Sequence, residues 1–188
     1  MLHLAVKNGD FELAESLLDE NASIEAPNKL GETPLHVAVS EGKMNLVCLL
    51  LDHGADINRT NKRGQTPLHI AVEIGHEDSV HLLLNRKACV DLADSSGMTP
   101  LFVACRKGIL KIVELLIDSG ADNENKCSPF PPLHLASLEG HTEILNLLID
   151  KGWNPNSIVK ARKDFLCKIG LKEISGCAPL HIACKKHI

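Results

Sequence analysis

The chain has 188 residues, of which 44% are hydrophobic and 23% charged, a composition typical of a folded globular protein and not of a disordered one. Its net charge of -4 argues against a nucleic-acid binder, which usually has a strong basic excess. Only 3% of residues are aromatic, so the core has to be built from small aliphatic side chains. No apolar run approaches the roughly 18 residues that a membrane span needs, and residues 1–10 show no signal pattern, so we expect no direct membrane insertion.

A block of the form x-Leu-His-x-Ala recurs along the chain. Its Leu falls at Leu2, Leu35, Leu68, Leu101, Leu133 and Leu180. The first three spacings are 33 residues, the fourth is 32 and the last is 47. The residues around the block repeat as well, with Gly-x-Thr-Pro-Leu at 31–35, 64–68 and 97–101. Equal spacing of near copies indicates an array of identical small structural units.

Elementary helix chemistry predicts two helices in each unit. In the copy that starts at residue 31, Thr33 is placed to cap a helix over 34–41 whose first residue is Pro34. Gly42 follows as a helix-ending residue. A second helix over 44–53 has an apolar stripe at helical spacing. One such helix pair is too small to bury its own stripe, so it needs the next pair.

A 33-residue period with Thr-Pro-Leu-His-x-Ala resembles the ankyrin repeat, over nearly the whole chain. The resemblance implies an all-α fold, an ankyrin-repeat solenoid of stacked helix–turn–helix units with β-hairpin-like fingers. One ankyrin-repeat domain would span 1–188, and both of its ends would cut through a repeat, so we expect a fragment of a longer array. We predict repeats at about 1–29, 30–62, 63–95, 96–127 and 128–156, an insertion at 157–175 and a partial repeat at 176–188.

Two places depart from the repeat pattern. In the fifth repeat Phe130 and Pro131 replace the usual Gly and Thr, and Phe130 either contacts a partner or folds back onto the neighbouring finger. The insertion at 157–175 either forms a short basic amphipathic helix, suited to an acidic partner, a membrane surface or calmodulin, or lies as a loop on the solenoid. Trp153 replaces a small residue and is expected to pack under this insertion.

The sequence shows no pattern of catalysis or of cofactor binding. No glycine-rich phosphate-binding motif occurs. His76 and His81 resemble a zinc-binding pair, but a spacing of five places them on different faces of a helix. The His of the repeated block is interpreted as a buried hydrogen-bonding residue of each layer. Seven scattered Cys without a Cys-x-x-Cys pair indicate reduced thiols. We therefore predict no enzyme, no cofactor and no metal.

By resemblance, partner proteins bind the concave face, which the finger tips and the exposed side of the first helices form. Mapped onto this chain, that face comprises Leu30, Glu32, Glu41, Lys62, Arg63, Gln65, Glu73, Ile74, Met98, Arg106, Lys107, Phe130, Leu138 and Glu139. The apolar members are the most informative, because the fold accepts polar residues at these positions.

The expected function is therefore that of a protein–protein interaction module, a scaffold or adaptor that acts as a monomeric array in the cytoplasm or the nucleus. The alternative is a cytosolic ankyrin arm of a larger membrane protein, or of an enzyme or ubiquitin-ligase adaptor whose effector domain lies outside this chain.

Overall fold

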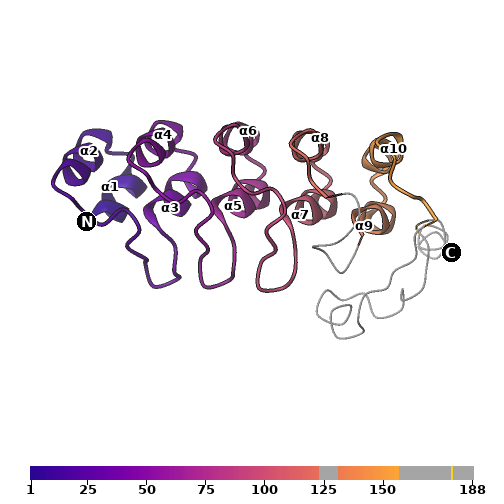
Figure 1. Cartoon of the computed structure of the whole chain (residues 1–188), viewed down its shortest axis with the longest axis horizontal. Helices are drawn as coiled ribbons and strands as arrows, with labels where there is room; N and C mark the ends of the chain where they lie inside the picture. Colours follow the sequence, from indigo (N-terminus) through magenta and orange to yellow (C-terminus); the bar gives the residue numbers. More distant parts are fainter. Residues whose placement is uncertain (123–130, 157–178, 180–188) are drawn as a thin grey trace. The chain divides into compact units, whose positions relative to one another are not determined.

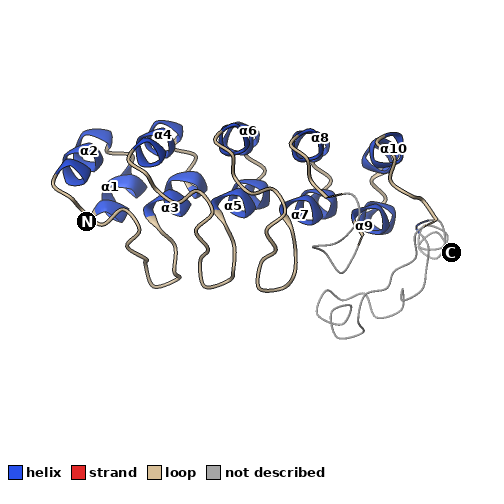
Figure 2. Ribbon diagram, viewed as in Figure 1, coloured by secondary structure: helices blue, strands red, loops and turns tan. Residues whose placement is uncertain are grey.

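The structure is a computed structural model of the chain, and it describes residues 1–122, 131–156 and 179. Two compact units, Met1–Cys89 and Val90–Ile188, divide the chain. In the described parts of both units every regular element is a helix (Figure 2), which confirms the predicted all-α class. The fingers are loops without β-strands within these described ranges, so the expected hairpin character is not confirmed.

The helices follow one another in pairs, each with a first, inner helix and a second, outer helix (Figure 1). The first unit contains α1 (Leu2–Asn8), α2 (Phe11–Asp19), α3 (Pro34–Ser40), α4 (Met44–Asp52), α5 (Pro67–Ile74) and α6 (Glu77–Asn85). The second contains α7 (Pro100–Lys107), α8 (Leu110–Asp118), α9 (Pro132–Glu139) and α10 (Thr142–Asp150). Within each unit inner helices contact inner helices and outer helices contact outer helices, as in the contacts of α1 with α3, α2 with α4, and α7 with α9.

The start and end of α5 show why these short helices form. Thr66 N donates to His69 Nδ1 over 3.2 Å, and His69 N donates to the Thr66 hydroxyl oxygen over 3.4 Å. This reciprocal pairing satisfies two backbone groups that a helix start leaves without partners. Pro67 takes the first helical position, where its missing N–H is not needed. Gly75 ends the helix in the left-handed conformation, with a φ of 76°.

The helices predicted at 34–41 and 44–53 occur as α3 and α4, each one residue shorter at its C-terminal end. Glu41 and His53 take the C-cap positions, where the backbone leaves helical geometry.

The Leu of the repeated block lies in the core of its unit. Leu35 and Leu68 are 0% exposed in the first unit, and Leu101 and Leu133 are 2% and 1% exposed in the second. Burying one such side chain contributes about 1.5–3 kcal/mol relative to leaving it exposed. The Leu of the repeated block is therefore a core position in both units.

The His of the repeated block links consecutive layers in the first unit. His3 Nε2 lies 2.9 Å from the carbonyl oxygen of Glu32, and His36 Nε2 lies 3.0 Å from that of Gln65. Because His36 Nδ1 accepts from Thr33 N, its Nε2 carries the proton and donates to Gln65. The predicted role of a buried, hydrogen-bonded His is confirmed for His36, whereas His3 makes the equivalent bond from a half-buried position.

A second set of hydrogen bonds between layers lies in the loops that follow the outer helices, and the sequence analysis did not predict it. Backbone N–H groups donate to a side chain 31 residues earlier: Asp56 to Glu25 Oε1, Cys89 to Asn58 Oδ1 and Asp122 to Asp91 Oδ1, over 2.7, 2.8 and 3.0 Å. The acceptors are 33 residues apart, so each layer holds the loop of the next. Burial raises the pKa of Asp91 above its usual value, and the bond from Asp122 opposes this rise.

The departures from the repeat have visible consequences where they are described. Pro131 stands at the N-cap of α9 and makes no side-chain cap. Phe102, in the place of the repeated His, is only 1% exposed. Trp153 is buried, as its apolar ring requires. Phe130 and the insertion at 157–175 lie outside the described residues.

Candidate protein-binding surfaces

Three loops between helix pairs share one backbone design. We name them finger 1 (28–32), finger 2 (61–65) and finger 3 (94–98). Each is closed by a bond from its first N–H to its last carbonyl: Asn28 to Glu32, Asn61 to Gln65 and Asp94 to Met98, all over 2.9 Å. The side-chain oxygen of the first residue also accepts two backbone N–H groups within the same finger. Sequence analysis missed this role of Asn28, Asn61 and Asp94, although their 33-residue spacing signals it.

Fingers 1 and 2 are joined directly. Lys62 N donates to the carbonyl oxygen of Leu30 over 3.1 Å, and Lys62 Nζ donates to that of Lys29 over 2.9 Å. A Cβ on Gly31 would lie 2.8 Å from Lys62 N, and Gly31 has a φ of 80°. Only glycine accommodates both the close approach and the left-handed backbone. The two tips therefore form one preorganised surface.

Most predicted contact residues of the first unit lie on its surface. Leu30 is 62% and Ile74 49% exposed. Glu41, Lys62 and Arg63 are also exposed, whereas Glu32 and Glu73 are half-buried.

The prediction that Gln65 lies on this solvent-facing surface is wrong. Its side chain is 8% exposed, and its Oε1 accepts from Asn61 Nδ2 over 3.3 Å. Its backbone carbonyl accepts from His36, which draws the residue into the junction between two layers. Gln65 is therefore not available to a partner on this surface.

In the second unit Arg106, Lys107 and Glu139 are exposed at the C-terminal ends of α7 and α9, while Met98 and Leu138 are half-buried. An Arg106 guanidinium nitrogen lies 3.8 Å from the Met98 sulfur, so α7 and finger 3 contribute to one surface. Phe130 lies outside the described residues.

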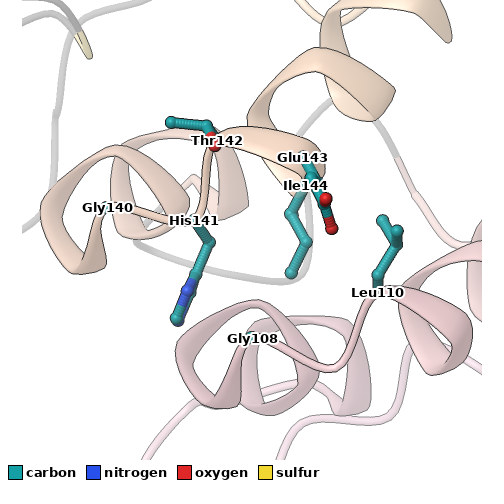
Figure 3. A pocket seen from close by; sticks show the side chains of 7 residues that line it. All are labelled: Gly108, Leu110, Gly140, His141, Thr142, Glu143 and Ile144. Atoms are coloured by element: carbon teal, nitrogen blue, oxygen red, sulfur yellow. The ribbon is translucent and has the colours of Figure 1, made fainter.

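A hollow of about 200 Å³ lies in the second unit at the start of α10. Figure 3 shows His141 directed toward Gly108, where a Cβ would lie 2.5 Å from the imidazole Cε1. His141 Nε2 donates to the carbonyl oxygen of Arg106 over 3.3 Å. The imidazole of His141 thus packs against the C-terminal end of α7. We interpret His141 as a residue that stabilises the packing of these two helix pairs.

The described parts of the chain contain no group of three or more His, Cys, Asp or Glu that could hold a metal ion. His76 precedes α6, and its Nδ1 lies 2.6 Å from the Ser79 hydroxyl; His81 lies exposed on α6.

Comparison with known protein families matches the chain to ankyrin repeats (3 copies) over residues 2–94, 49–127 and 89–159. These matches cover most of the chain. It belongs to the ankyrin-repeat family. Among curated proteins, none matches the chain. In the described part of this ankyrin-repeat protein, no helix has both the length and the apolar character needed to cross a bilayer.

Ankyrin repeats generally serve as protein–protein interaction modules and are typically not enzymes. The packing of this chain fits that role, because the buried faces join the layers and leave the fingers and the ends of the inner helices exposed.

Proposed function

We propose that this ankyrin-repeat protein is a scaffold or adaptor that binds a partner protein through its fingers and the exposed side of its inner helices. In this proposal the chain works as a monomeric array in the cytoplasm or the nucleus and has no catalytic role of its own. Each unit would present its own set of binding residues.

The observation that carries the proposal is the exposure of two apolar residues that the fold does not require. Leu30 is 62% exposed at the place in finger 1 that is taken by Arg63 in finger 2 and by Ser96 in finger 3. A polar residue thus serves equally well at this position of a finger. Exposed apolar side chains that packing does not demand are typical of the centres of interaction sites.

Ile74, at the end of the inner helix α5, is the second exposed apolar residue that the fold does not require. It is 49% exposed, and the equivalent positions of the neighbouring repeats are Glu41 and Lys107. Leu30 and Ile74 would therefore act as apolar anchors of the first unit, together with the charged residues Glu41, Glu73 and Arg63 of the same proposed face. In the second unit the corresponding surface carries Arg106, Lys107 and Glu139.

The test is a comparison of partner binding between surface variants. Partners captured by the wild-type chain are purified, and their affinity is measured for the double variant Leu30→Ser/Ile74→Ser. Leu13→Ser is the matched control, because Leu13 is 41% exposed but lies on the outer helix α2.

We expect the double variant to lose at least about tenfold in affinity, which corresponds to about 1.4 kcal/mol, without a change in melting temperature. Charge reversal of Arg106 and Lys107 tests the second unit in the same way. If Leu13→Ser abolishes binding and the finger and inner-helix variants do not, the partner binds the outer helices and the proposed face is incorrect.

A further inference from the structure

The tips of fingers 1 and 2 gather positive charge in a protein that is acidic as a whole. Lys29, Lys62 and Arg63 are all exposed there, although the chain carries a net charge of -4. Within residues 28–32 and 61–65 Glu32 is the one acidic residue, and its Oε2 accepts from Asn28 Nδ2 over 2.8 Å. The surface that these tips present is therefore cationic.

An apolar side chain lies within this cationic cluster. Leu30 stands between Lys29 and the glycine that contacts Lys62, and its carbonyl oxygen accepts from Lys62 N over 3.1 Å. Its own side chain is 62% exposed. The cluster thus combines three cations with one bulky apolar group on two fingers that hydrogen bonds hold together.

We propose that the tips of fingers 1 and 2 bind an acidic peptide segment of a partner protein that carries a bulky apolar side chain. This proposal rests on the proposed function and names the chemistry of the partner at one part of the face. Carboxylates of the segment pair with the Arg63 guanidinium, whose planar donors match a carboxylate, and with the ammonium groups of Lys29 and Lys62. The apolar side chain packs on Leu30.

The rigidity of the tips favours such binding. Asn28 and Asn61 each hold their finger with a side-chain oxygen that accepts two backbone N–H groups, and Lys62 joins the two fingers. A surface that is ordered before the partner arrives loses less conformational entropy on binding.

Nucleic acid is the other polyanion that a cationic cluster attracts, and it fits this surface less well. Single-stranded nucleic acid is bound by aromatic side chains that stack on its bases, whereas the apolar group here is a leucine. The acidic character of the whole chain also opposes a polyanion that extends beyond the finger tips.

A random dodecapeptide library displayed on phage is the probe for the experiment. After selection on the wild-type chain, enriched peptides are synthesised, and their affinities are measured for wild type, Arg63→Glu, Lys29→Glu and Leu30→Ser. Lys87→Glu is the matched control, since Lys87 is exposed in the same unit but lies in the loop after α6. A labelled single-stranded oligonucleotide is titrated in parallel.

We expect enriched peptides with several Asp or Glu and at least one large apolar residue. Arg63→Glu and Leu30→Ser should each weaken them at least about tenfold, Lys87→Glu less than about twofold, and binding should weaken as salt rises. The proposal is overturned if no acidic peptides are enriched, if the finger variants bind them as wild type does, or if the oligonucleotide binds more tightly than the peptides with the same dependence on Arg63.

Failure of this proposal and failure of the proposed function are distinguishable. Peptides or captured partners that depend on Ile74 but not on Arg63 or Leu30 would leave the binding role of the face intact and exclude the acidic site at the finger tips. Binding that depends on Leu13 but not on Ile74, Arg63 or Leu30 would exclude both the proposed binding face and the acidic-peptide site.

Discussion

His36 donates a hydrogen bond from its Nε2 to the carbonyl oxygen of Gln65, 29 residues later, over 3.0 Å. Its other ring nitrogen accepts from Thr33 N over 3.1 Å. One buried side chain thus completes the start of α3 and at the same time holds finger 2 against it. The imidazole of His36 therefore links the N-terminal cap of α3 to the packing of one layer on the next.

Replacing this imidazole by a ring without hydrogen-bonding atoms should destabilise the first unit. His36→Phe keeps most of the volume, and Phe102 shows that a buried phenyl ring fits the equivalent position of the second unit. The variant leaves Thr33 N without its acceptor and removes one of the two donors to the Gln65 carbonyl, the other being Asn61 N, so we expect a loss of about 1–3 kcal/mol in the free energy of unfolding. Urea titration measures it. His81→Phe, on the exposed side of α6, is the control and should change stability by less than about 0.5 kcal/mol.

The same histidine makes stability depend on pH. Burial lowers the pKa of His36 below its ordinary value of 6.5. Between the lowered pKa of the folded state and 6.5, the unfolded chain binds the proton more readily, so protonation favours unfolding. The stabilising contribution of the neutral imidazole is present above pH 6.5 and is lost as the pH falls through the folded-state pKa.

Urea unfolding at neutral and at mildly acidic pH checks this prediction. Wild type should lose more stability than His36→Phe when the pH is lowered, because the variant lacks the titrating group. Equal losses in the two proteins would show that other groups cause the acid sensitivity.

A structural feature of this chain was predictable when the residues that determine it lie within one repeat. The burial of Leu35 and Leu68 follows from their place in a 33-residue pattern, and the starts of α3 and α5 follow from Thr and Pro. The burial of Gln65 did not follow, because its environment is made by His36 of the preceding layer and by Asn61 of its own finger. A finger residue that looks solvent-facing in the sequence becomes interior once two layers stack.

The exposure of the residues assigned to the candidate face was predictable in outline, whereas their hydrogen bonds were not. The exposure of Leu30 and Ile74 agrees with the prediction from the repeat pattern. The bonds from Lys62 to finger 1 were not foreseen, since a lysine at a finger tip has no sequence signal that says which carbonyl it reaches. The contact of His141 with Gly108 was missed for the same reason.

Two leucines at the same repeat position give a matched test of stacking. Leu46 on α4 is 0% exposed, whereas Leu13 on α2, 33 residues earlier, is 41% exposed. We expect Leu46→Ala to cost about 2–5 kcal/mol, because it removes a fully buried side chain and leaves a cavity. Leu13→Ala should cost less than about 1 kcal/mol, since much of its surface is already in water. Similar costs for the two variants would argue that the layers do not stack in the repeat register.

Two glycines separate the effect of a steric clash from that of backbone strain. Gly108 and Gly140 have φ values of 75° and 76°, but a Cβ on Gly108 would lie 2.5 Å from His141 Cε1, whereas nothing lies within 4 Å of one on Gly140. Gly140→Ala should cost about 1–2 kcal/mol through the left-handed backbone alone. Gly108→Ala should cost measurably more.

Thermal unfolding of Gly108→Ala in the His141→Ala background then isolates the clash. Removing the imidazole should bring the cost of Gly108→Ala down toward that of Gly140→Ala. An unchanged cost would mean that His141 does not pack on Gly108 in solution.

Amide hydrogen exchange of the chain with and without a purified partner tests the binding account most directly. We predict slower exchange on partner binding at residues 28–32 and 61–65 and around Ile74, with the outer helices α2, α4 and α6 unchanged. Slower exchange confined to α2, α4 and α6, with the fingers exchanging as in the unbound chain, would contradict it.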